Sequence, residues 1–160
     1  MKRSASKEWI GYGLILIFSV LLDQYTKVLC LDHLKPIDMY DLWPGVFRLN
    51  YEENTGAAFS MLSNHTWIFI VLTVVLCAVI TYILAKGLVR SSVARVALVF
   101  VLSGGIGNLI DRIFRGYVVD MFDFYLIDFA VFNVADIFVC CGCALFVLMY
   151  LISKGEILDG

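Results

Sequence analysis

Three aspartates in the second half of the chain have the residue type and spacing that acid–base chemistry needs. Asp136 lies within an apolar run, and Asp120 and Asp123 lie in a short segment before it. Two carboxyl groups about 3 Å apart cannot both ionise easily, so the pKa of one rises and the pair shares a proton. Such a pair contains a base that can deprotonate water and an acid that can protonate a peptide carbonyl oxygen. The residues alone leave open whether Asp120 or Asp123 would join Asp136.

Other polar residues lie near the ends of the same apolar runs. Asp23 and Lys27 are four residues apart on one helix face, so a purely structural ion pair explains them as well as a functional role does. Asn133 and Asp136 are three residues apart and also share a face. Ionisable side chains within membrane-spanning segments are costly and by default indicate a functional site. The polar set comprises Asp23, Lys27, Asn54, Asn108, Asp111, Arg112, Asp120, Asn133 and Asp136.

Asp136 is the most informative member of this set. It follows the expected start of the fourth apolar run by about seven residues, which predicts a depth of roughly 10 Å at about 1.5 Å per residue. A carboxylate at that depth needs a polar neighbour or a proton. Hydrogen bonding to Asn108 or Arg112 is the structural alternative to a catalytic role.

The composition indicates a membrane protein. Of the 160 residues, 61% are hydrophobic and only 16% are charged, and the mean hydropathy is +0.89. Soluble domains carry about a quarter charged residues, and a chain of this size could not bury the apolar surplus, so lipid must cover it. The net charge of −2 and the lack of a Lys/Arg-rich tract argue against nucleic-acid binding. The five cysteines and two histidines lack the spacing of a disulfide framework or a zinc site.

Four apolar runs are long enough to cross a bilayer, which needs about 20 residues. We expect one membrane-embedded domain over residues 1–160, with spans at about 10–31, 66–85, 96–114 and 129–153. The first run continues into Asp23 without a small-residue cleavage site, so we expect a retained helix rather than a cleaved leader. Basic residues near both termini and between the second and third runs place these three segments in the cytoplasm.

The segment between the first two spans, about 32–65, is too long for a plain turn. Around 46–52, apolar and polar residues alternate with the period of a strand that has one covered face. The alternation sets Phe47, Leu49 and Tyr51 against Arg48, Asn50 and Glu52. The expected fold class is therefore an all-α polytopic membrane protein, with four transmembrane helices and a small extracytoplasmic strand-rich element between helices 1 and 2.

Five short motifs contain nearly all of these polar residues. They are Asp23-Gln24-Tyr25-Thr26-Lys27, Asn54-Thr55-Gly56-Ala57-Ala58-Phe59, Gly107-Asn108-Leu109-Ile110-Asp111-Arg112, Val118-Val119-Asp120 and Phe132-Asn133-Val134-Ala135-Asp136. In order and spacing they resemble the bacterial lipoprotein signal peptidases, also called prolipoprotein or type II signal peptidases. Each motif alone is weak evidence, but the five together are specific and cover essentially the whole chain.

The resemblance implies an intramembrane aspartyl endopeptidase with four spans and a small extracytoplasmic β-cradle. Its substrates would be diacylglyceryl-modified prolipoproteins, cut just before the lipidated cysteine, and it would need no metal and no cofactor. By motif, the catalytic pair would be Asp120 and Asp136. The enzyme would be a monomer in the bacterial cytoplasmic (inner) membrane, among membrane lipids, with both termini cytoplasmic and the active site near the outer leaflet. The residues at lining and supporting positions would be Asn54, Gly56, Asn108, Arg112, Asn133, Asp23, Lys27 and Asp111.

Three other functions are compatible with parts of the sequence. A proton-coupled small membrane transporter could use Asp136, although such proteins place their site at the midplane and show internal repeats. A membrane thiol oxidoreductase could use the CxxC pattern of Cys140 and Cys143, although these thiols lie deeper than Asp136. A serine protease using Ser103 is a weaker alternative, because neither histidine lies in a span to activate it.

Overall fold

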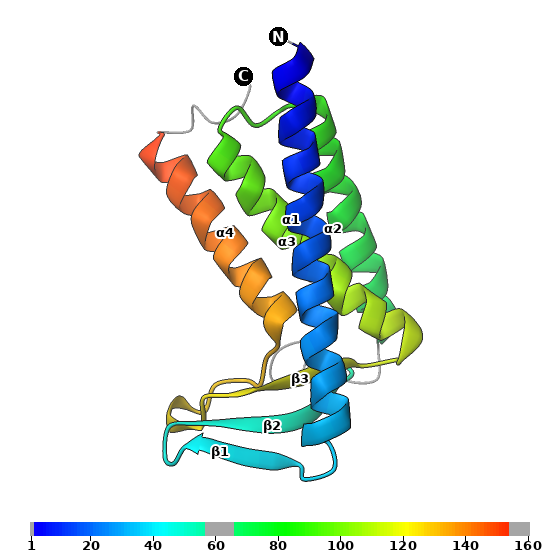
Figure 1. Ribbon diagram of the computed structural model, residues 1–160, viewed down its shortest axis with the longest axis vertical. Helices are drawn as coiled ribbons and strands as arrows, with labels where there is room; N and C mark the ends of the chain where they lie inside the picture. The colour runs from blue at the N-terminus through cyan, green and yellow to red at the C-terminus, as the bar shows by residue number, and fades with distance from the viewer. Residues whose placement is uncertain (1, 57–65, 154–160) are drawn as a thin grey trace.

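The computed structural model describes residues 2–56 and 66–153, and within these ranges it contains four long α-helices and a small sheet (Figure 1). By length and composition, all four helices can cross a membrane. The start of α1 and the end of α4 lie at the same end of the bundle, and the sheet lies at the opposite end (Figure 1). The helices are α1 (Lys2–Leu29), α2 (Thr66–Lys86), α3 (Ser92–Phe114) and α4 (Val134–Ile152).

The ends of the first and third helices differ from the expected spans. Beyond α1 the chain continues as a short π-helix, Cys30–Leu34, so the first span extends past residue 31. The third helix starts at Ser92 rather than at 96, because the hydroxyl of Ser91 accepts a hydrogen bond from the Ala94 amide at 3.3 Å. A serine in this position satisfies one of the amide groups that a helix leaves unpaired at its first turn.

The fourth helix begins at Val134, not at residue 129 as the apolar run suggested. The Asn133 side chain accepts a hydrogen bond from the Asp136 amide, and the Asp136 side chain accepts one from the Asn133 amide. This reciprocal capping box starts the helix. Asp136 therefore lies in the first turn of α4, and the expected depth of roughly 10 Å within the helix is wrong. Residues 129–133 belong to a loop that lies between the sheet and α4 (Figure 1).

The sheet contains three antiparallel strands in the order β1–β2–β3, namely β1 (Met39–Trp43), β2 (Phe47–Asn54) and β3 (Val118–Asp123). The hairpin of β1 and β2 confirms the strand-rich element expected after the first span. The third strand was not expected, because it comes from the segment after α3 and pairs with β2, where Glu52 lies opposite Asp120. The rest of the expected outer segment, 57–65, lies outside the described residues.

The bundle is built around α3, which is the most buried helix and packs against the other three. The second helix, in contrast, buries only Ile80 and Leu84 and leaves large side chains such as Leu72 exposed, a surface suited to lipid. Close approach between α3 and α4 depends on glycine. A Cβ added at Gly142 would lie 2.6 Å from the carbonyl oxygen of Ala97 on α3.

We predict that Gly142→Ala lowers the thermal stability of the protein in detergent, because overpacking of this kind costs about 1–3 kcal/mol. The matched control is Gly13→Ala on α1, where an added Cβ meets nothing within 4 Å. Alanine is the better helix former by about 1 kcal/mol, so the control should be as stable as the wild type or more so. Equal melting temperatures for the two variants would contradict the close α3–α4 contact.

Candidate active site

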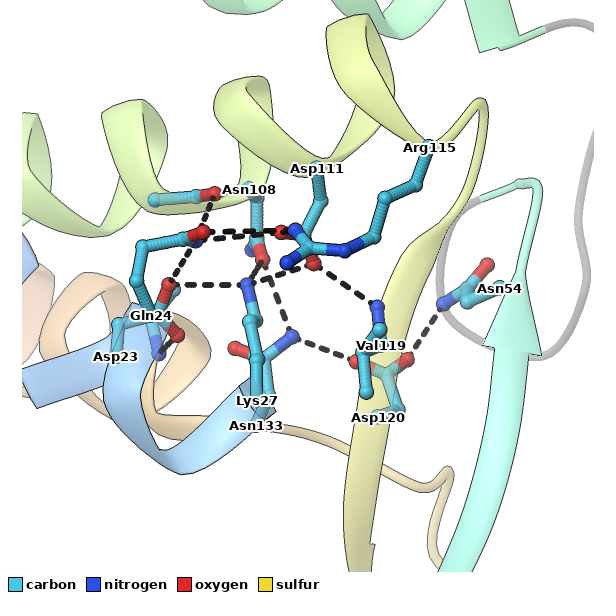
Figure 2. A network of polar contacts seen from close by, with 12 residues as sticks. Asp23, Gln24, Lys27, Asn54, Asn108, Asp111, Arg115, Val119, Asp120 and Asn133 are labelled. Carbon is cyan, nitrogen blue, oxygen red and sulfur yellow. Dashed lines mark hydrogen bonds and ion pairs between the residues drawn. The ribbon is translucent and has the colours of Figure 1, made fainter. Parts of the chain in front are cut away.

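Most of the expected polar residues gather at the sheet end of the bundle, on α1, α3, β2 and β3 and at the residue that precedes α4 (Figure 2). Asp120 on β3 and Asp136 in the first turn of α4 both line a cavity of about 540 Å³. Asp123, the other candidate partner, lies away from this cavity and accepts a 2.7 Å hydrogen bond from Arg48 Nε instead. The structure thus brings Asp120 and Asp136 to one cavity and leaves Asp123 in an ion pair within the sheet.

Asp120 is buried, with 2% of its surface exposed. Its Oδ2 accepts a 2.9 Å hydrogen bond from Asn54 Nδ2, and its Oδ1 accepts a 2.6 Å hydrogen bond from Asn133 Nδ2. Burial, followed by the negative charge of Asp136, raises the pKa of Asp120 to about 7, although both amide donors act in the opposite direction. Asp120 can therefore hold or release a proton near neutral pH.

Asp136 is half-buried and accepts two hydrogen bonds. Asn108 Nδ2 donates to its Oδ1 at 2.8 Å, and the Asn133 amide donates to its Oδ2 at 3.1 Å. The hydrogen bond from Asn108 is the one that the structural alternative predicted, so this carboxyl group has a structural role whatever else it does. The two asparagines also connect Asp136 to Asp120. The side chain of Asn133 donates from Nδ2 to Asp120, and the same Nδ2 donates to Asn108 Oδ1 at 3.1 Å.

Arg112 forms another side of the cavity and contacts Gly56. Arg112 lines the cavity, donates from Nη2 to the carbonyl oxygen of Gly56 at 3.2 Å, and lies 5.3 Å from the centre of the Phe69 ring. Gly56 in turn donates its amide to Asn54 Oδ1 at 2.9 Å, which orients the Asn54 amide toward Asp120. The motif residues 57–59 that follow lie outside the described residues. The contact with Gly56 links the start of that motif to α3.

A cluster of four charges lies behind the two carboxyl groups. Lys27 is fully buried, and its Nζ is 3.0 Å from Asp23 Oδ2 and 3.2 Å from Asp111 Oδ2. Asp111 also forms an ion pair with Arg115, so two cations balance two carboxylates. The ion pair expected between Asp23 and Lys27 is therefore present. Pairing of this kind is what a charge removed from water requires.

The same cluster positions the backbone on which the cavity residues lie. Asp111 Oδ2 accepts a 3.0 Å hydrogen bond from the Val119 amide, next to Asp120 (Figure 2). Asp23 Oδ1 accepts a 2.9 Å hydrogen bond from the Ala135 amide, next to Asp136. The buried carboxylates thus connect α1 and α3 to β3 and to the start of α4.

Two residues in and beside this cluster, Arg115 and Gln24, had no predicted role. Arg115 follows Asp111 by one helical turn, a spacing that signals an ion pair. Gln24, within the first motif, donates from Nε2 to the Gly107 carbonyl oxygen at 3.1 Å and to Asp111 Oδ1 at 3.2 Å. The Gln24 contacts join residues far apart in the chain, and no local pattern signals them.

Most of the remaining cavity wall is apolar. It is formed by the start of β3, the loop before α4 and the first turns of α4, and the residues are Val118, Phe129, Ala130, Val131, Phe132, Ile137, Cys140 and Cys141. Ser103, considered as a nucleophile, donates its hydroxyl to the Phe100 carbonyl oxygen of its own helix at 2.9 Å. Among residues 2–56 and 66–153, no three His, Cys, Asp or Glu side chains converge as a metal site would require.

Comparison with known proteins assigns the chain to a family. The family model described as signal peptidase (SPase) II matches residues 15–152, which is most of the chain. The chain belongs to the signal peptidase II family. That family consists of proteases, which favours the hydrolytic interpretation of the two carboxyl groups over the transporter and oxidoreductase alternatives.

Relatives and solved structures agree with membership of the signal peptidase II family. The lipoprotein signal peptidase of Caldanaerobacter subterraneus subsp. tengcongensis is 48% identical over 143 residues, which cover 89% of this chain and 97% of the relative. That of Streptococcus thermophilus is 41% identical over 128 residues, or 80% of this chain and 84% of the relative. A bacterial membrane enzyme solved at 2.3 Å by the in meso method has a TM-score of 0.83 and 28% identity, covering 94% of this chain and 93% of that one. A second such structure, at 1.9 Å, has a TM-score of 0.79 and 30% identity, covering 88% and 92%.

We predict that the free energy of unfolding of the wild-type protein decreases as pH rises, and that it decreases more steeply than that of an Asp120→Asn variant. A carboxyl group with a pKa near 3.8 when unfolded and about 7 when folded binds an extra proton in the folded state between these values. Stability therefore falls as pH rises through that interval and levels off above it. Thermal unfolding in detergent between about pH 4 and pH 8 measures the difference, and parallel curves for the two proteins would contradict a raised pKa of Asp120.

Proposed function

We propose that this protein is an intramembrane aspartyl endopeptidase that removes signal peptides from diacylglyceryl-modified prolipoproteins, cutting just before the lipidated cysteine. The observation that carries the proposal is that Asp120 and Asp136, from two separate elements, line one cavity and both accept hydrogen bonds from Asn133, Asp120 from its side chain and Asp136 from its backbone amide. Membership of the signal peptidase II family and relatives named lipoprotein signal peptidase support the choice of substrate.

The proposed reaction uses the two carboxyl groups as one acid–base pair that holds a single proton. The ionised carboxylate takes a proton from a water molecule, whose oxygen attacks the carbonyl carbon of the scissile peptide bond. The protonated carboxyl group donates its proton to the carbonyl oxygen. The tetrahedral intermediate then collapses and the C–N bond breaks: one carboxyl group gives its proton to the leaving amine, and a hydroxyl group of the intermediate returns a proton to the other carboxylate, so that the pair again holds a single proton. The raised pKa of Asp120 supports the presence of one proton on the pair near neutral pH.

The shape of the site suits a substrate that is itself in the membrane. The cavity joins a polar end at the two carboxyl groups to an apolar wall that includes Phe129 and Ile137. A lipid-modified cysteine would leave its acyl chains in the bilayer while the adjacent peptide bond reaches the polar end. Holding enzyme and substrate in one membrane plane reduces the entropy that must be lost before reaction.

The proposed orientation places the sheet outside the cytoplasmic (inner) membrane of a bacterium and both termini in the cytoplasm. The ends of α1 and α4 that lie away from the sheet are on the same side, as an even number of spans requires (Figure 1). The proposed enzyme acts as a monomer, in which Asp120 and Asp136 of the same chain line one cavity.

Replacement of either carboxyl group tests the proposal directly. We expect Asp120→Asn and Asp136→Asn each to reduce cleavage of a purified diacylglyceryl-modified prolipoprotein by about a hundredfold or more, because each removes one member of an acid–base pair. Asp123→Asn, on the same strand as Asp120 but outside the cavity, is the matched control and should retain most activity. Mass spectrometry of the products locates the cut relative to the lipidated cysteine.

The outcomes separate the parts of the proposal. Cleavage by both cavity variants at the wild-type rate would reject the catalytic assignment, provided that thermal unfolding shows both proteins to be folded. Loss of activity in Asp123→Asn alone would move the catalytic role to the alternative carboxyl group. A folded wild-type protein that leaves the substrate intact would reject the proposed activity itself.

The pH dependence of cleavage should respond to Asn54. Its amide donates to Asp120 and lowers the pKa of that carboxyl group, so Asn54→Leu should raise this pKa. Asp120 then keeps its proton to a higher pH, and the basic limb of the kcat/KM profile should move upward from about 7. Glu53→Gln, at the neighbouring and more exposed position of β2, serves as the control and should leave the limb in place. A basic limb that moves downward or not at all in Asn54→Leu would contradict the acid role of Asp120.

A further inference from the structure

Lys27 has no part in the proposed reaction, yet its fully buried ammonium group contacts Asn108, whose side chain also contacts Asp136. An ammonium group has three protons to donate and no lone pair to accept with. Here the three partners are Asp23 Oδ2, Asp111 Oδ2 and Asn108 Oδ1, the last at 2.9 Å (Figure 2). The contact with Asn108 is the one that leads from the charge cluster to the cavity.

The contact with Lys27 determines which way the Asn108 amide faces. An amide has an acceptor end and a donor end, and Lys27 can only donate, so the end that faces Lys27 must be Oδ1. The other end, Nδ2, then faces the cavity and donates to Asp136 at 2.8 Å. A reversed amide would place two donors against each other at Lys27 and an oxygen against the carboxylate of Asp136. Either contact costs free energy in a buried site.

Asn133 provides a second donor to Asn108 Oδ1, at 3.1 Å. This donor is neutral, whereas hydrogen bonds from charged donors are roughly twice as strong. The orientation of Asn133 itself is fixed differently, because its Oδ1 accepts from the backbone amide of Asp136 at 3.0 Å. Among the described contacts of Asn108, Lys27 is therefore the partner with the greatest influence on the amide.

We propose that Lys27 is a positioning residue of the carboxyl pair: it fixes the amide of Asn108 so that this amide donates to Asp136 and holds that carboxyl group ionised, as the base. The proposal rests on the proposed function in one respect, namely that the ionised Asp136 acts as a base in peptide cleavage. The orientation of the amide and its effect on the proton of the pair can be measured without any cleavage.

Other charges near Asp136 must be considered before the effect is assigned to the amide. Asp120 on β3 and Arg112 on α3 lie near Asp136, and the cluster of charges on α1 and α3 lies behind Asn108. The cluster contains Lys27, Arg115, Asp23 and Asp111, so its net charge is zero. A variant that removes one cation and one carboxylate of the cluster leaves that net charge unchanged. Such a variant isolates the hydrogen bond from the field of the charge.

Two charge-neutral double variants make a matched comparison. Asp23→Asn with Lys27→Met removes the ammonium donor of Asn108, and Asp111→Asn with Arg115→Met removes the other ion pair but keeps Lys27. We expect the first double variant to raise by about one pH unit the pH at which the pair takes up its second proton, because one hydrogen bond to the charged form is lost. At pH values on the acidic limb we expect kcat to fall about tenfold with little change in KM, since a shift of one unit is a tenfold change in equilibrium. The second double variant should leave that pH unchanged.

Two measurements follow this proton. One is the acidic limb of kcat/KM for the prolipoprotein substrate, and the other is the carboxyl band in infrared spectra of the protein in detergent, identified by its loss in Asp136→Asn. The infrared titration decides the proposal even if the wild type cuts no prolipoprotein, so failure of the proposed function is a separate result. An unmoved titration in the first double variant, or an equal shift in both, would overturn the positioning role.

Asn108→Leu keeps the proposal testable if the first double variant does not fold. It removes the amide while leaving all four cluster charges, and it should produce the same upward shift. In a folded triple variant that combines all three changes, the shift should not increase further, because Lys27 acts through Asn108. An unmoved titration in Asn108→Leu, or additive shifts in the triple variant, would contradict the proposed path.

Discussion

The buried ammonium group of Lys27 constrains the whole sheet end of the molecule. A charge removed from water costs several kcal/mol unless it is paired and hydrogen-bonded, and here α1 and α3 supply every partner. The two carboxylates that pair with it use their remaining lone pairs on the backbone amides of Val119 and Ala135. Satisfying one charge therefore also sets the positions of β3 and α4. The neighbouring residues Asp120 and Asp136 meet at one cavity as a consequence.

The fold was predictable where apolar and polar residues alternate along the chain and not where the composition is uniform. The alternation at 46–52 predicts β2, although the strand itself is half-buried along almost its whole length. No such alternation marks β3, since nearly all of its residues are buried. The start of α4 was placed too early because the apolar composition continues through 129–132 without a break. The true start of α4 is indicated by the three-residue spacing of Asn133 and Asp136. That spacing is typical of a capping box at a helix start, and it also occurs between residues that share a helix face.

The grouping of the site residues was predictable from the cost of polar side chains in a membrane, but their pairing was not. Asp120 and Asp123 lie in the same short segment, and residues three apart point to opposite faces only if the segment is a strand. That strand exists because β2 is available to pair with it, which no local pattern reveals. The resemblance to a family selected Asp120 at the sequence level, and the position of Asp123 beside Arg48 agrees with that selection.

The strand order has a consequence for how the protein is made. Asp120 lies on a strand whose partner, β2, comes from the loop between α1 and α2, and Asp136 lies on the last helix. The residues that line the cavity run from Asn54 to Cys141, so the cavity cannot form while the ribosome is still synthesising α4. A nascent chain with three inserted helices has Asp120 but not Asp136. The proposed proteolytic activity would thus begin only after the final helix has entered the membrane.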